Sequence, residues 1–163
     1  MSLKADTYEE STDISFFYNE GTATRGGVVV LDAVNASGAA MDQGANKVKY
    51  AQAVSADVPV GILLNDVVNK DLTRTHLNQY KDEVQKGGKV TVLTRGWVVT
   101  SNVEGTPGPG DVAYASNSSA GAISNYASDA TGSGNLAIGR WASSKDADGY
   151  AKVYVNLPNH GAN

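Results

Sequence analysis

The sequence predicts a mainly β protein: a small antiparallel β-barrel or sandwich with an extended N-terminal arm and one irregular or short-helical insertion. Glycine supplies 18 of the 163 residues while charged residues make up only 18%, a composition typical of short strands joined by many turns. Apolar and polar residues alternate with the period of a half-buried strand from Val90 to Val98, with a short break, and from Tyr150 to Leu157. Proline and glycine cluster at Thr106 to Gly110, which favours a chain reversal between strands.

The first twenty residues carry the whole net charge of −4. They hold five acidic residues against Lys4, whereas the remaining 12 acidic and 12 basic residues cancel. The polar composition of residues 1–13 predicts disorder in the free protein. Two interpretations stay open, a solvated terminus and an acidic arm that orders against a basic surface of a partner. Because the rest of the chain has no basic excess, the sequence does not indicate a nucleic-acid partner.

The first strongly apolar segment follows this arm, from Ile14 to Tyr18, and contains both phenylalanines of the chain, Phe16 and Phe17. We expect it to anchor the arm, either on the chain's own core or on a neighbouring subunit. Further strands are predicted at residues 26–32, 47–54 and 60–64. The run Val28-Val29-Val30 is continuously apolar, which is typical of a strand buried on both faces.

Residues 65–86 interrupt the β pattern with a dense set of charges. Apolar and aromatic residues spaced by four could form one face of a helix, but threonine, asparagine and β-branched residues weaken a helix there. A short helix and an irregular excursion remain open. We expect this insertion to cross one end of the barrel, within a single β-domain at residues 21–158 that lies between an arm at 1–20 and a tail at 159–163.

The stretch from Gly87 to Ala115 predicts a compact β-meander around Trp97. Arg95-Gly96 separates two strand-like runs, and a new strand begins at Val112. Later strands are predicted at residues 123–126, 136–142 and 150–157. The Asp-Gly pair in residues 146–149 is a hairpin signal, not a calcium loop, because the required Glu is missing.

No residue pattern indicates catalysis, a metal site or a cofactor. The chain has no cysteine and two histidines, His76 and His160, and it lacks the common nucleophile, zinc and phosphate-loop motifs. A hydrolase using His76 with Asp71 or Asp82 is the weakest hypothesis that we keep. No apolar run reaches the roughly 18 residues of a membrane span, and no apolar signal core is present at the N-terminus, so we expect neither a membrane partner nor export.

Several short motifs, taken in their order and spacing, resemble one known family. They are Val60-Gly61-Ile62-Leu63, Lys81 to Leu93, Gly105 to Tyr114, Ile138-Gly139-Arg140, and Lys145 to Pro158. The run from Val60 to Pro158 is similar to head decoration, or cement, proteins of tailed bacteriophages. This resemblance implies a small β-barrel or sandwich without catalytic residues, made in the host cytoplasm. It also implies binding to the major capsid protein on the outer surface of the virion, often as a homotrimer with N-terminal arms.

These considerations give a set of expected contact residues for the capsid or a neighbouring subunit. They are Asp6, Glu9, Glu10 and Asp13 on the arm, Phe16 and Phe17 as its apolar anchor, and Arg74, His76 and Tyr80 on the insertion. The alternative function is a carbohydrate-binding or adhesin-type β-module on a virion or cell surface. It rests on the tyrosine-rich strands, in which Tyr150 and Tyr154 are predicted to share one face.

Overall fold

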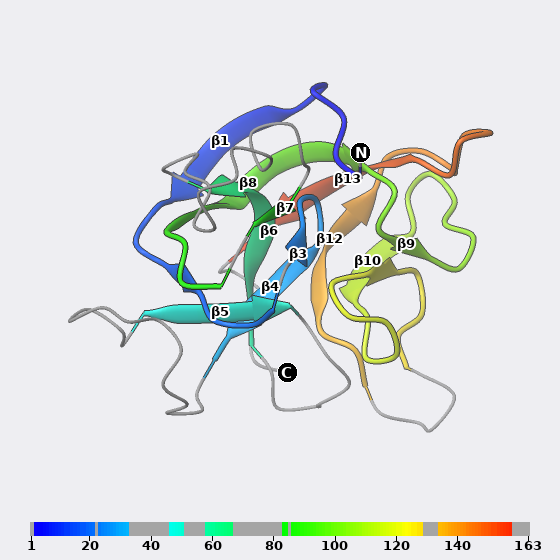
Figure 1. Cartoon of the computed structure of the whole chain (residues 1–163). Helices are drawn as coiled ribbons and strands as arrows, with labels where there is room; N and C mark the ends of the chain where they lie inside the picture. The colour runs from blue at the N-terminus through cyan, green and yellow to red at the C-terminus, as the bar shows by residue number, and fades with distance from the viewer. Residues whose placement is uncertain are drawn as a thin grey trace.

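A computed structural model describes residues 2–21, 23–32, 46–50, 58–66, 83–84, 86–128 and 134–157. Within these ranges every regular element is a β-strand (Figure 1), which confirms the mainly β prediction. No helix capable of crossing a membrane occurs among them. The strands are β1 Tyr8–Asp13, β2 Phe17–Tyr18, β3 Ala23–Thr24, β4 Val28–Leu31, β5 Lys47–Tyr50, β6 Pro59–Asp66, β7 Glu83–Val84, β8 Val90–Thr100, β9 Val103–Glu104, β10 Val112–Ala115, β11 Ile123–Ser124, β12 Ala137–Trp141 and β13 Ala151–Asn156.

One sheet contains most of these strands. Its order is β2-β5-β4-β6-β8-β13-β12-β10-β11-β9, and β1 adds to it by pairing with β8, while β3 and β7 form a separate antiparallel pair. The two end strands, β2 and β9, do not pair with each other in the described residues, so the sheet is open there. Closure into a barrel, or packing as a sandwich, stays a prediction.

The central strands are buried on both faces, as the continuous apolar run in β4 predicts. Val28, Val29 and Val30 are each at most 1% exposed, yet they divide between two cores because successive side chains of a strand point in opposite directions. The first core contains Val28, Val30, Ile62, Leu64, Leu93, Val98, Ala113, Ala115, Ile123, Ile138, Trp141, Ala151, Val153, Val155 and Leu157. The second core contains Tyr18, Ala23, Val29, Val48, Tyr50, Leu63, Val84, Val90 and Val92.

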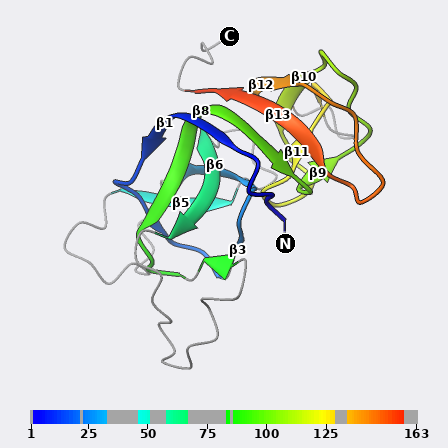
Figure 2. The ribbon, with the colours of Figure 1, turned by 90° about the horizontal axis from the view of Figure 1, so that it is seen from above.

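The longest strand, β8, organises the sheet. Its first residues, Val90–Leu93, pair with β6, and its last, Arg95–Thr100, pair with β13. Strand β1 pairs with Val92–Trp97 and therefore occupies the opposite edge of β8. Figure 2 shows β1 and β13 on either side of β8. The predicted meander is wrong, because β13 and β12 lie between β8 and β10.

The sequence predicts a boundary between two strands at Arg95-Gly96. In the structure β8 continues through these residues, but its geometry is irregular there. Val92 packs in the second core and Val98 in the first, although residues six apart would share a face of a regular strand. The pairing of β1 with β8 shifts register twice between Glu9 and Thr12, opposite this segment. Gly96 has a φ of 139°, so the side chains of β8 switch faces of the sheet near this residue while the strand continues.

The N-terminal arm is ordered on the chain itself, so the prediction that residues 1–13 are disordered is wrong for residues 8–13. Beyond β1, Leu3 forms a bridge with Thr100, and the Lys4 N–H donates to the Val99 carbonyl at 2.9 Å. Polar composition does not predict this order, because it depends on the free edge of β8, whose backbone groups need partners.

The last hairpin agrees with the sequence. The Asp146 N–H donates to the Tyr150 carbonyl at 2.8 Å, and the Gly149 N–H donates to the Asp146 carbonyl at 3.0 Å, which closes the turn between antiparallel β12 and β13. Along β13 buried residues alternate with partly exposed ones up to Asn156, as predicted.

Part of the expected insertion at 65–86 is strand: Asn65 and Asp66 end β6, and β7 pairs with β3. Residues 67–82 and the tail at 159–163 lie outside the described residues, so a helical insertion stays a prediction.

Candidate interaction surface

An aromatic and cationic contact joins β1, β8 and β13 on their outward side. The rings of Tyr8 and Trp97, which are register partners, stack with centroids 6.3 Å apart and planes inclined by 24°. On the other neighbouring strand the Lys152 Nζ atom lies 3.4 Å from the centre of the Trp97 ring. Trp97 is therefore held between a tyrosine of the arm and a lysine of β13, and it fastens the arm to the body.

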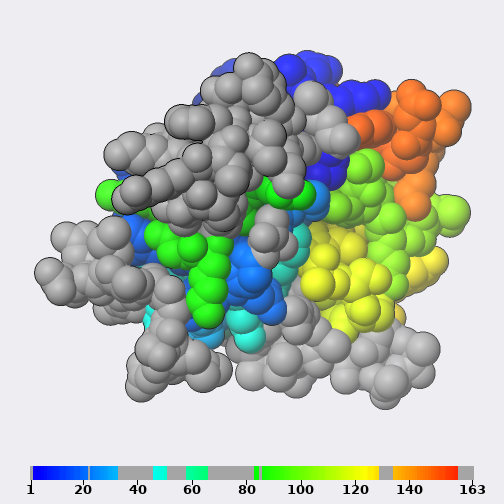
Figure 3. All heavy atoms as spheres, in the orientation of Figure 1, coloured from blue at the N-terminus to red at the C-terminus, as the bar shows by residue number. Residues whose placement is uncertain are grey.

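Two ion pairs also link the arm to the rest of the chain. The Arg95 Nε atom lies 2.8 Å from a Glu10 carboxylate oxygen, and a hydrogen bond with Tyr154, followed by the charge of Glu10, raises the pKa of Arg95. Near the N-terminus Lys4 Nζ lies 2.9 Å from Asp146 and 4.3 Å from the centre of the Tyr150 ring. Figure 3 shows the N-terminal residues, in blue, close to the orange residues that precede β13.

The Lys4–Asp146 pair has coupled titrations. The hydrogen bond from Lys4 is the largest cause that lowers the pKa of Asp146, and the backbone N–H of Tyr150 adds to it. The same hydrogen bond raises the pKa of Lys4. Both groups are exposed, so solvent screens the interaction and its contribution to stability is small.

The expected contact residues of the arm fall into two groups. Asp6 and Glu9 are exposed to solvent. Glu10 pairs with Arg95, and the Asp13 carboxylate accepts a hydrogen bond from the Ser15 N–H at 2.7 Å. Every residue of β1 from Tyr8 to Thr12 is exposed, so the arm presents its acidic side chains outward.

The two phenylalanines have different environments. Phe17 is 6% exposed, so it anchors the arm within this chain. Phe16 is partly buried and packs against the second core. Arg74, His76 and Tyr80 lie outside the described residues, as does the predicted proximity of His76 to Asp71 or Asp82.

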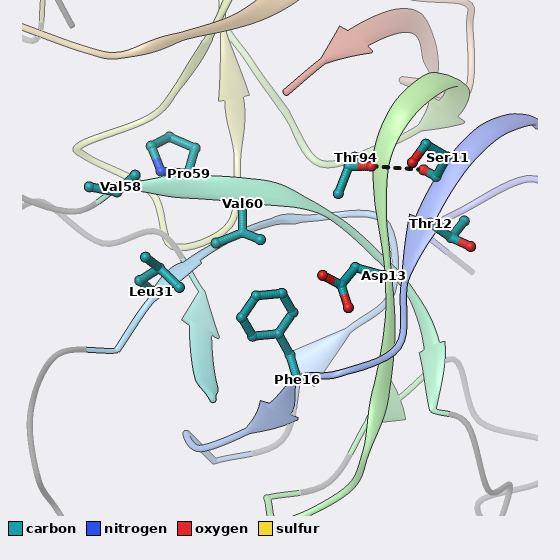
Figure 4. Close-up of a pocket in the computed structure, with 9 residues that line it drawn as sticks. All are labelled: Ser11, Thr12, Asp13, Phe16, Leu31, Val58, Pro59, Val60 and Thr94. Carbon is teal, nitrogen blue, oxygen red and sulfur yellow. Dashed lines mark hydrogen bonds between the residues drawn. The ribbon is translucent and has the colours of Figure 1, made fainter. Parts of the chain in front are cut away.

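A pocket of about 620 Å³ opens where the arm ends (Figure 4). Sequence reasoning did not identify it, because its walls come from segments far apart in the chain. The local pattern that could have indicated it is the set of apolar residues around the starts of β2 and β6. Its lining residues are Ser11, Thr12, Asp13, Phe16, Leu31, Val58, Pro59, Val60 and Thr94.

Two lysines of the chain lie over aromatic rings near the tyrosines expected for a sugar platform. Tyr154 is partly exposed in β13, and Tyr150 directly precedes that strand; Lys4 lies over the Tyr150 ring and Lys152 over Trp97. One face of the Tyr150 ring and one face of the Trp97 ring are therefore covered by a lysine of the same chain.

The described residues contain no group of three histidine, cysteine or acidic side chains that could hold a metal ion. Ser116 and Ser118 both donate to the Glu104 carboxylate, and the Ser116 hydroxyl accepts from the N–H groups of Ser118 and Ser119. These bonds hold the turn after β10.

Comparison with known proteins places this fold in a family. A family model described as "Structural cement protein (E217 gp24/Pam3 gp6)", of phage cement proteins, matches residues 9–156. A solved chain from the capsid of Myoviridae phage XM1 has a similar fold, with a TM-score of 0.52 and 15% sequence identity over 94% of this chain and 85% of that chain. No curated protein matches the sequence. The chain belongs to the family of structural cement proteins of bacteriophage capsids.

Proposed function

We propose that this protein binds the outside of a phage head, contacts the major capsid protein and stabilises the shell. The observation that carries the proposal is the family match over residues 9–156. A second observation supports it: strand β1 presents exposed side chains from Tyr8 to Thr12, in a segment that holds the net negative charge of the chain. An exposed acidic surface favours a basic partner surface and speeds the encounter with it.

The protein acts by contact and not by catalysis in this proposal, and it needs no cofactor. Each copy makes modest contacts, and the symmetry of the shell repeats them, so that joined copies bind far more tightly than one copy alone. We propose that the chain does so as a homotrimer, made in the host cytoplasm and added to the outer surface of the virion.

The proposed contacts are those expected from the sequence. Asp6, Glu9, Glu10 and Asp13 meet the shell or a neighbouring subunit from the arm, with Phe16 beside them, while Phe17 fixes the arm to the body. Arg74, His76 and Tyr80 contribute from residues 67–82. The exposure of Asp6 and Glu9 supports the first part of this set.

Co-sedimentation with expanded capsids that lack the protein tests the proposal. We expect the wild-type chain to bind at a saturable copy number and to raise the temperature at which the capsids break. A variant with Asp6→Lys and Glu9→Lys keeps the arm's pairs with Arg95 and Asp146, and we expect it to bind several-fold more weakly. Failure of the wild-type chain to bind capsids at any concentration would remove the proposal, and a monomeric mass at micromolar concentration would remove the trimer.

A further inference from the structure

The pocket at the end of the arm is an opening of the second core to the surface. Phe16 and Val60 pack against this core and are only partly buried, and both line the pocket. Leu31 and Val58, at its rim, are 44% and 45% exposed. Ile14, which lies between the lining residues Asp13 and Phe16 in the sequence, is 51% exposed.

The described chain concentrates its exposed large apolar side chains at this place. Two of the five, Leu31 and Val58, line the pocket, and a third, Ile14, lies between two lining residues in the sequence; the other two, Tyr8 and Tyr126, do not line it. Scattered single apolar residues are normal on a protein surface, whereas a group beside a hollow is typical of a binding site.

One wall of the pocket is polar and carries a single charge. Figure 4 shows the Asp13 carboxylate directed toward Phe16 and the interior of the pocket. Its position is fixed by the Ser15 N–H, which donates to Asp13 Oδ1 at 2.7 Å. Beside it the Thr94 hydroxyl donates to the Ser11 carbonyl at 3.0 Å. Among the described lining residues there is no lysine or arginine, so the pocket is apolar with one fixed negative charge.

We propose that this pocket docks a short segment of the capsid shell protein that carries a large apolar side chain next to a lysine or arginine. The inference rests on the proposed function and names the site and the chemistry of the contact. A volume of about 620 Å³ accommodates a few side chains. The apolar side chain packs on Phe16, Val60 and Leu31, and the cation pairs with Asp13 while its aliphatic stem covers the rim.

Charge favours a basic segment over a second copy of this chain. A two-fold contact places the same patch of both copies face to face, so two Asp13 carboxylates and two acidic arms would approach each other. In a trimer the pocket would meet a different surface of the neighbouring copy, but residues 21–163, with 12 acidic and 12 basic residues, offer no net positive charge to Asp13. The first twenty residues hold five acidic residues and one lysine. A basic segment of another protein meets no such repulsion.

Two substitutions with matched controls test the docking on expanded capsids that lack the protein. Leu31→Ser removes an exposed apolar wall, and we expect capsid affinity to fall about tenfold. Asp13→Asn keeps an acceptor for the Ser15 N–H and removes only the charge, so we expect a loss of about three- to tenfold and a weaker dependence on salt. Asp148→Asn makes the same change as Asp13→Asn away from the pocket, and Tyr126→Ser likewise removes an exposed large side chain there; we expect affinities within about twofold of wild type.

The outcomes separate this inference from the proposed function. If the wild-type chain does not bind capsids, the proposed function fails. If it binds and the Leu31 and Asp13 variants, shown to be folded by thermal melting, bind equally well, only the pocket proposal is overturned. A photo-reactive benzoylphenylalanine at position 58 gives an independent reading on assembled capsids. Cross-linking to a shell peptide with a basic residue beside an apolar one supports the proposal, whereas cross-linking to a second copy of this chain, or to nothing, overturns it.

Discussion

The ammonium nitrogen of Lys152 lies 3.4 Å from the centre of the Trp97 ring. Tyr8 stacks on the same indole from the arm, with ring centroids 6.3 Å apart. A single side chain of β8 thus connects the first and last strands of the chain. The acidic arm, for whose residues 1–13 the composition predicts disorder, is in the folded protein one side of this contact.

Trp97→Ala should loosen the arm. The substitution removes one aromatic stack and one cation–π contact, together worth about 1–3 kcal/mol, and we expect a lower melting temperature. Hydrogen exchange at residues 8–13 should accelerate more than exchange in β13, which keeps its ladder with β8. Trp97→Phe retains a ring, and its melting temperature and arm exchange rate should lie between those of wild type and the alanine variant. Unchanged protection of the arm in the alanine variant would contradict this role.

Gly96→Ala should combine backbone strain with a steric clash against the arm. Gly96 has a φ of 139°, and a Cβ there would clash with the Tyr8 carbonyl oxygen of β1. We expect a loss of more than about 2 kcal/mol from backbone strain and displacement of the arm, measured by chemical denaturation.

Gly149→Ala is the matched control for that variant. Gly149 also has a positive φ, 85°, but a Cβ there would meet nothing within 4 Å. We therefore expect only the left-handed strain, about 1–2 kcal/mol. Equal losses of unfolding free energy in the two variants would show that the close approach of the arm to Gly96 does not add to the cost of the substitution.

The Lys4–Asp146 pair predicts a pH-dependent contribution to stability. Its hydrogen bond holds the pKa of Asp146 below the ordinary value, so the contribution is present above the unfolded pKa of about 3.9 and is lost as the pH falls through the folded pKa. Asp146→Asn should therefore be less stable than wild type at pH 6, and the difference should shrink toward pH 2. A difference that stays constant across this range would refute the assignment.

The raised pKa of Tyr18 predicts a loss of stability toward alkaline pH. Burial is the largest cause that raises the pKa of its phenol, and the charge of Glu20 adds to it. Because the folded pKa exceeds the unfolded value of about 10, stability is fully present below pH 10 and is lost as the pH rises above it.

Tyr18→Phe isolates that effect. It keeps the edge-on ring contact with Tyr50, whose centroid lies 6.0 Å away, and removes the ionisable group. The variant should lose less stability than wild type between pH 9 and pH 11, as followed by urea denaturation. Parallel pH profiles for the two proteins would count against a titrating Tyr18 as the cause.

Local patterns were sufficient wherever the structure depends on neighbours in the sequence. The apolar run of β4, the alternation of β13 and the Asp-Gly turn before it all match the structure. The meander failed because strand order depends on which edges meet: β13, from the end of the chain, pairs with β8 and separates it from β10. The pocket likewise joins residues 11–16, 31, 58–60 and 94, which no local pattern connects.

The sequence alone determined the β class, the burial of both faces of β4 and the acidic character of the arm, because side-chain periodicity and charge are local properties of the chain. Only the tertiary structure decided that the arm pairs with β8, that β13 lies beside it, and that Phe16 and Asp13 line one pocket. These arrangements depend on backbone edges that need partners and on side chains brought together from distant segments, and neither is encoded in the spacing of residues along the chain.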